Sequence, residues 1–281
     1  MFTDLEFNYK ITTEAMDKFC QNDIEKLRVW TQNLDKTKCV PRDLTDKQLV
    51  LFYNACYGDM ANTKLCIEKY YQCRKDFPEF FNNRVFNADL KASAEVFEFS
   101  VLPEYSSKGY DIIYNRLNDD NVWKFNLINE IKLLLMTVDL CLTKRGPRPG
   151  LIFIFDLQIK FGHLLKMNPL IIRKLILYLQ DALPVRMHAI HILNAEPILD
   201  KLMGLLKPFM NKKFFDKITF HNKNESLEKF YDIVPRSSLP PIYGGTLPNT
   251  QLLHKNCLEQ LHSLEMYFKS EEEQRLVALS T

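Results

Sequence analysis

Residues 151–156 read LIFIFD, a short run that is apolar on both faces of an extended chain. Such a run is typical of a strand buried in a sheet with cover on each side. A second apolar run, AIHILN at 189–194, follows it. The segment between them predicts a helix, because Asn168 and Pro169 supply an N-cap and a preset first turn, and apolar residues then recur at helical spacing: Ile172, Leu175, Ile176 and Leu179. Strand, helix and strand in this order predict a right-handed crossover in a parallel or mixed sheet.

The alternation of strands and helices continues on both sides of this unit. DIIYNR at 111–116 and ITF at 218–220 predict two more strands, and residues 127–142 predict a strongly apolar helix that stops before Gly146 and Pro147. The sequence therefore predicts an α/β domain, which we place at residues 99–248.

The first hundred residues carry helix signals and little that is typical of strands. Thr45 and Gln48 have the spacing of a capping box before the run LVLFYNAC. Cys66, Tyr70, Cys73 and Phe77 mark one face of a second helix, and Pro78 limits its extension. We expect a small helical domain over 1–98. Residues 249–281 predict a C-terminal helical extension, with one polar helix over 251–279 and an acidic run at 271–273.

Composition and charge exclude several classes of protein. The 281 residues are 46% apolar, and 37 basic residues nearly balance 35 acidic ones, so no nucleic-acid partner is predicted. The seven cysteines are scattered without zinc-site spacing, which favours reduced thiols and a cytoplasmic protein. The first residues lack the apolar run of a signal peptide, and no run of about 18 apolar residues occurs. We therefore expect neither secretion nor a membrane span.

No catalytic signature appears. The chain has no GxSxG, P-loop or GxGxxG motif and only eight glycines. His188 and His191 are three apart, so on a strand they are expected to face opposite sides and not to share a metal. Asp156 could act as a general base or cap a turn, and without a partner nucleophile the structural role is favoured. The sequence predicts neither an enzyme nor a metal site.

Residues 197–220 combine an unusually apolar helix with many lysines. Six lysines and one acid, Asp216, lie between 201 and 223, and Pro208 is expected to end or kink the helix near Lys207. The apolar positions recur at helical spacing: Ile198, Leu202, Leu205, Leu206 and Phe209. A core helix with a solvated lysine face and a helix that faces something other than protein remain equally open.

Three blocks in order identify a family resemblance. PVRMHAIHILNAEP at 184–197, KPFMNKKFFDKITFH at 207–221 and LPPIYGG at 239–245 resemble the CRAL-TRIO lipid-binding domain, in the branch of the alpha-tocopherol transfer protein, retinaldehyde-binding protein and clavesins. LVLFYNAC and the later YYQCRKDFP look like the small helical domain that precedes it in that family. The resemblance covers residues 45–245.

This resemblance implies the CRAL-TRIO fold, in which a mixed, mostly parallel sheet is covered by helices and a mobile helix acts as a gate. It implies a carrier that encloses one hydrophobic molecule, such as a tocopherol, retinoid, carotenoid or other lipid, and transfers it between membranes. No cofactor besides that ligand is implied. The expected protein is a cytoplasmic monomer that associates transiently with membranes.

The resemblance also implies pocket positions, for each of which ordinary core packing is the alternative. Thr137 would orient a ligand hydroxyl. The expected lining is Leu134, Thr137, Phe153, Phe155, Leu175, Tyr178, Leu179, Leu183, Val185, Met187, Ile190, Leu205, Leu206 and Met210. An anionic-lipid or phosphoinositide site would fall on Arg186, His188, Lys213 and Lys217, with a solvated charged face as its alternative.

Three departures from the family pattern affect these expectations. Asn54 and Cys56 stand where the family usually has two arginines, which weakens headgroup-specific recognition relative to plain anionic attraction. Ile242 replaces an acid before YGG, and Phe153 with Phe155 makes the pocket more aromatic, so tocopherol is not assumed. An alternative function is a lipid-filled module that binds a partner protein, favoured by the acidic C-terminal helix.

Overall fold

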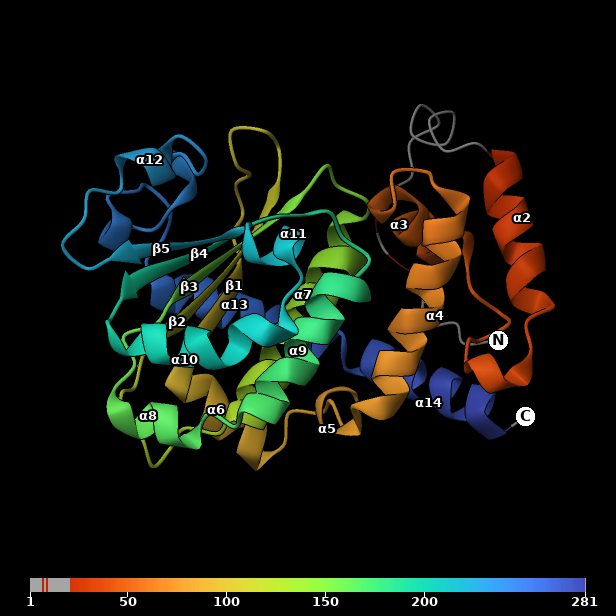
Figure 1. Cartoon of the computed structure of the whole chain (residues 1–281), viewed down its shortest axis with the longest axis horizontal. Coiled ribbons are helices and arrows are strands. Elements are labelled where there is room, and N and C mark those ends of the chain that lie inside the picture. The colour runs from red at the N-terminus through yellow and green to blue at the C-terminus, as the bar shows by residue number, and fades with distance from the viewer. Residues whose placement is uncertain (1–6, 8, 10–20, 281) are drawn as a thin grey trace.

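The computed structural model describes residues 7, 9 and 21–280, so the expectation about a signal peptide lies outside the described residues. The chain begins with helices α2 (Gln21–Gln32), α3 (Asp46–Ala55), α4 (Met60–Asp76), α5 (Pro78–Phe81) and α6 (Ala88–Val96). The capping box is confirmed, because Thr45 and Gln48 exchange side-chain to backbone hydrogen bonds at the start of α3. Helix α4 ends before Pro78, which opens α5 as its first residue. Helices α2, α3 and α4 form one end of the molecule, whereas α6 packs against α7 and β1 on the side of the sheet (Figure 1).

A single five-stranded sheet forms the other end, with the order β1-β2-β3-β4-β5. Its strands are β1 (Phe97–Val101), β2 (Asp111–Leu117), β3 (Leu151–Asp156), β4 (Met187–Ala195) and β5 (Ile218–Asn222). Strand β1 is antiparallel to β2, and the other neighbours are parallel. The mixed, mostly parallel sheet of the predicted fold class is therefore confirmed.

Both faces of the sheet are covered, as LIFIFD predicts. Phe153 belongs to the larger core, with helices α7 (Leu127–Arg145) and α9 (Pro169–Asp181). Ile152 and Ile154 point the other way, into a smaller core that includes Phe230 of α12 (Glu228–Tyr231). Helices α8 (Phe161–Lys166), α10 (Ile198–Leu206) and α11 (Lys212–Phe215) complete the first layer (Figure 1). Helix α10 ends before Pro208, as predicted.

Strand β1 was missed by the sequence reading, which found little strand signal in the first hundred residues. Its sequence, FEFSV, follows α6 without a turn residue and is buried almost throughout. Buried Glu98 is tolerated because its carboxylate pairs with Arg116 of β2 at 3.2 Å. A charged residue interrupts the apolar pattern that predicts a buried strand, and only its partner in the fold explains why it can be buried there.

The prediction of one C-terminal helix was wrong. The segment forms α13 (Thr250–Ser263) and α14 (Glu265–Ser280), which meet at Leu264. Helix α13 packs against β1, whereas α14 lies beside the N-terminal helices (Figure 1). The bend has no glycine or proline to announce it, and it allows Leu261 of α13 and Phe268 of α14 both to be buried.

The histidine prediction was also wrong, because β4 contains an irregularity. Leu151 pairs with Met187 and Ile152 with Ala189, so His188 has no partner on β3. Its ring lies 4.2 Å from that of Tyr110, and the ring of His191 lies 5.0 Å from that of Phe230. Both aromatic partners belong to the smaller core or pack on it, so the two histidines share one side of the sheet.

Candidate functional site

An apolar cavity of about 200 Å³ lies between the sheet and helices α7, α9 and α10. All five strands contribute residues to its lining, and so do the covering helices α10 and α11. Among the described residues that line it, only Asn115 and Glu130 have polar side chains. The remaining surface is aliphatic, aromatic or thioether, which suits a hydrophobic ligand.

Local sequence patterns build this cavity. On β4, Ile190 and Ile192 line it, whereas Ala189 and Leu193 between and beyond them pack in the smaller core. On α10 the residues at helical spacing turn inward: Leu199, Leu202, Met203 and Leu206 line the cavity. The opposite side of α10 carries Asp200, Lys201 and Leu205, all exposed.

Half of the pocket positions expected from the sequence line the cavity. They come from five elements of the fold and from the turn after α10, and they meet around one space. These residues are Leu134, Phe155, Leu175, Leu179, Ile190, Leu206 and Met210. Their role in binding stays a prediction.

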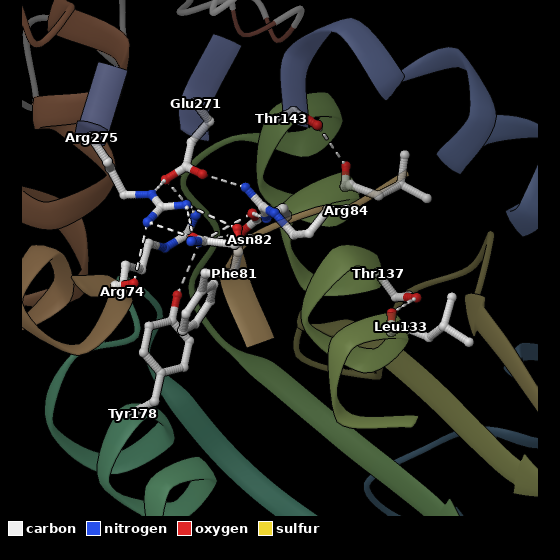
Figure 2. Close-up of polar contacts among 12 residues, drawn as sticks. Arg74, Phe81, Asn82, Arg84, Leu133, Thr137, Thr143, Tyr178, Glu271 and Arg275 are labelled. Atoms are coloured by element: carbon white, nitrogen blue, oxygen red, sulfur yellow. Dashed lines mark hydrogen bonds and ion pairs between the residues drawn. The ribbon is translucent and has the colours of Figure 1, made fainter. Parts of the chain in front are cut away.

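The other expected positions lie elsewhere. Phe153 is fully buried and stacks on Phe155, with ring centroids 5.6 Å apart. Thr137 donates its hydroxyl to Leu133 O of its own helix at 2.9 Å, and Tyr178 accepts a hydrogen bond from Arg74 (Figure 2). Leu205 is 56% exposed. Leu183 is buried, while Val185 and Met187 are half-buried, and none of the three lines the cavity.

The sequence reading missed several lining residues that periodicity could have found. Leu127, Glu130 and Ile131 precede Leu134 by seven, four and three positions, which places them on the same face of α7. Leu199 and Leu202 precede Leu206 by seven and four positions, so helical spacing places them on the same face of α10. Asn115, Phe125, Phe214 and Phe220 reach the cavity only through the packing of separate segments.

A buried ionic cluster lies beside this site and joins both ends of the chain. We use this name for Arg74, Arg84, Asp139, Glu271 and Arg275 (Figure 2). Burial disfavours the charge of Glu271, but attraction to the three guanidinium groups outweighs it and lowers the pKa of this carboxyl to about 2. Glu271, the first residue of the acidic run at 271–273, is therefore paired inside the molecule.

The four expected basic positions have different surroundings. Arg186 donates from Nε to the Asn54 carbonyl at 2.8 Å and lies over the ring of Tyr57, so its guanidinium is engaged by the N-terminal helices. The side chain of Asn54, the departure from the family pattern, donates from Nδ2 to the Arg148 carbonyl at 3.0 Å. Burial, then the charges of Lys108 and Lys217, lowers the pKa of His188. Lys108 was missed by the sequence reading, and Lys213 is exposed.

Large apolar side chains are exposed on α8, α9, α10 and the loop before α7. They come from the elements that surround the covered side of the cavity. The group consists of Trp123, Phe161, Leu165, Leu170 and Leu205, each more than half exposed. Over the described part of the chain, the helices are too short or too polar to cross a bilayer.

Comparison with known proteins agrees with this architecture. A model of the CRAL/TRIO domain matches residues 98–245. The human alpha-tocopherol transfer protein-like protein (Homo sapiens) is 27% identical over 205 residues, which is 72% of this chain and 59% of that protein. The mouse protein of the same name (Mus musculus) is 26% identical over the same length. This chain thus matches about three fifths of the length of these relatives.

Two further similarities extend the comparison. Clavesin-1 of Xenopus laevis is 33% identical over 100 residues, or 35% of this chain and 30% of clavesin-1. The solved structure titled "Crystal structure of Sfh5" superposes with a TM-score of 0.54 at 14% identity, covering 83% of this chain and 90% of that one. At this identity the superposition establishes the fold alone.

Proposed function

This chain belongs to the CRAL/TRIO domain family, and from that premise we propose that it binds one hydrophobic ligand in the cavity under α10 and transfers it between membranes. The candidate ligands are a tocopherol, a retinoid, a carotenoid or another lipid. The observation that carries the proposal is the cavity itself, an apolar space with two polar lining side chains in a chain of this family. The names of the transfer-protein relatives support the same class of activity.

The size of the cavity supports a mobile gate. Its volume of about 200 Å³ is below the ~300–1,000 Å³ of common small-molecule pockets. A larger ligand would need one wall to move. Helix α10 is the proposed gate, because its inner face is apolar and Pro208 separates it from the following turn. Burial at about 25 cal/mol per Å² would retain an apolar ligand once the gate closes.

The surface around the gate supports contact with a bilayer. Exposed Phe161, Leu165 and Leu205 would enter the acyl region, while Lys201, Lys207 and Lys213 would meet anionic headgroups. We propose a transient association of this kind, made by a cytoplasmic monomer with no catalytic role. His188, Lys213 and Lys217 are the proposed phosphoinositide or anionic-lipid contacts, with Arg186 contributing if its contact to Asn54 opens.

The proposed organisation keeps the division into 1–98, 99–248 and 249–281. The larger core is continuous across these parts, since it includes Leu27 and Phe268 as well as the sheet. We therefore propose that the flanking helices brace the lipid-binding part. They would not act as separate modules.

The alternative, a partner-binding module, has lost some of its support. Glu271, from the acidic run that favoured it, is 3% exposed and paired with three arginines. Removal of residues 251–281 would strip Leu261 and Phe268 from the core, so surface substitution of exposed Glu273 is the cleaner probe of partner contact.

The direct test is native mass spectrometry of the purified protein, followed by organic extraction and a transfer assay between donor and acceptor vesicles. A stoichiometric hydrophobic molecule that moves between vesicles would support the carrier. A stably folded, empty protein that takes up no retinoid, tocopherol or phospholipid would refute it.

A further inference from the structure

Glu130 lies in the first turn of α7 and lines the apolar cavity. Its side chain is only 6% exposed, and neither carboxyl oxygen has a hydrogen-bond partner among the described residues. Its neighbours along the cavity wall, Leu127, Ile131 and Leu134, are aliphatic. A carboxyl group is thus enclosed by hydrocarbon at the place where a ligand would lie.

This arrangement sets Glu130 apart from the other buried acids of the described chain. Each of the other five is held by a named partner at hydrogen-bond distance. The pairs are Glu98 with Arg116 (3.2 Å), Asp111 with Arg145 (2.8 Å), Asp139 with Arg74 (2.7 Å), Asp156 with Asn194 (2.7 Å) and Glu271 with Arg275 (2.7 Å). The fold therefore satisfies its buried carboxyl groups, except the one in the cavity.

Burial is the cause of the pKa shift of this group. It raises the pKa of the Glu130 carboxyl well above its ordinary value, and no charged neighbour opposes the shift. This shift favours the uncharged acid. An uncharged carboxylic acid can donate one hydrogen bond through its O–H and accept others at its carbonyl oxygen.

A buried polar group without a partner destabilises the protein that contains it. A ligand that enters the cavity could remove this penalty only by presenting a matching polar atom. We propose that Glu130 is the hydrogen-bonding anchor for the polar end of the ligand, which is an uncharged hydroxyl or carbonyl group on an otherwise apolar molecule. This inference rests on the proposed carrier function and adds to it the residue that selects the cargo.

The chemistry of the cavity lining indicates which polar group the ligand carries. A cationic amine would require an ionised carboxylate and would itself have to lose its hydration in an apolar space. A neutral hydroxyl or carbonyl needs no charge on either partner. Asn115, the other polar residue of the lining, can supply a second neutral hydrogen bond. The site therefore fits an alcohol, aldehyde or ketone better than an amine.

The test compares two probes that differ in one polar group: retinol and the same polyene with its hydroxyl replaced by hydrogen. Their affinities for the full chain are measured by fluorescence titration, with retinylamine as a third probe. The wild type is expected to bind retinol about five- to tenfold more tightly than the hydrocarbon, which corresponds to one hydrogen bond. Glu130→Leu should lose most of this preference, with any remainder left to Asn115. Glu130→Gln, which keeps a donor and an acceptor, should retain most of the preference.

Leu134→Val is the matched control, because it changes the volume of the same wall without changing its polarity. It should alter both affinities together and leave their ratio unchanged. A wild type that binds both probes equally, or that prefers retinylamine, would overturn the anchor while leaving the carrier intact. A preference for retinol that is undiminished in Glu130→Leu would also overturn the anchor. A wild type that binds none of the probes would count against the carrier and the anchor together.

Discussion

The Nη2 atom of Arg74 lies 2.7 Å from the Oδ1 atom of Asp139, and this pair joins helix α4 to helix α7 in the interior. Both side chains are almost completely buried. Arg84, from the segment after α5, and Glu271, from α14, complete the contact (Figure 2). The ionic cluster thus connects the two ends of the chain to the helix that carries Glu130.

Replacing one member of this cluster should lower the free energy of unfolding far more than the loss of an ion pair at the surface would. Arg74→Met leaves Asp139 without one of its two guanidinium partners, and we expect the free energy of unfolding to fall by about 3–5 kcal/mol in urea titrations. Lys38→Met is the control, since Lys38 pairs with Glu68 at the surface. Comparable losses for the two variants would contradict a structural role for the cluster.

The acid limb of the stability profile should depend on Glu271. Its pKa falls from an ordinary 4.5 to about 2 in the folded protein, so its contribution is present above pH 4.5 and is lost as the pH falls through 2. Glu271→Gln should therefore be less stable than the wild type at pH 7, and the two curves should converge between pH 4.5 and 2. Unfolding measured at a series of pH values tests this. A constant difference would exclude the linkage.

A second pH dependence should come from His191. Burial, with smaller effects of His221 and His188, lowers its pKa from 6.5 to about 4. The unfolded chain takes up a proton first, so stability is present above pH 6.5 and is lost as the pH falls toward 4, by about 3 kcal/mol. His191→Gln should flatten this window in thermal or urea unfolding. The same change at exposed His262 should leave the window as it is in the wild type.

The two faces of α10 should separate loading from membrane contact. Leu206 lines the cavity and is 4% exposed, whereas adjacent Leu205 is 56% exposed. Leu206→Asn places an amide in the apolar space and should weaken ligand binding by more than about tenfold. Leu205→Asn should load normally but transfer more slowly between vesicles. Equal loading defects in both variants would argue against this orientation of the gate.

The lysines near the gate should govern attachment to anionic vesicles. Lys213→Ala and Lys217→Ala should each reduce partitioning onto phosphatidylserine vesicles about fivefold, since a lysine near such a surface is worth about 1 kcal/mol. The effect should shrink as salt is added. Lys255→Ala is the control, because α13 packs on β1, at the opposite sheet edge from β5. Sedimentation with vesicles measures all three.

Local patterns sufficed for most elements of the fold. The capping box at Thr45, the N-cap at Asn168 and the stop at Pro208 act through neighbouring backbone groups, so each is visible in a few residues. Strand β1 and the bend at Leu264 were not predicted, because buried Glu98 depends on Arg116 of another strand and the bend depends on the burial of Leu261 and Phe268. The bulge at His188 reversed a face assignment for the same reason.

The sequence by itself determined a two-sided α/β sheet, a family resemblance and an apolar helix beside lysines, because periodicity and motif order are properties of neighbouring residues. Only the tertiary structure decided which apolar residues line the cavity and which, like Phe153 and Tyr178, fill the core. It also decided that Glu130 lacks a partner while Asp139, nine residues along the same helix, has two arginines. Burial and hydrogen bonding are properties of packed surroundings, which segments far apart in the chain supply.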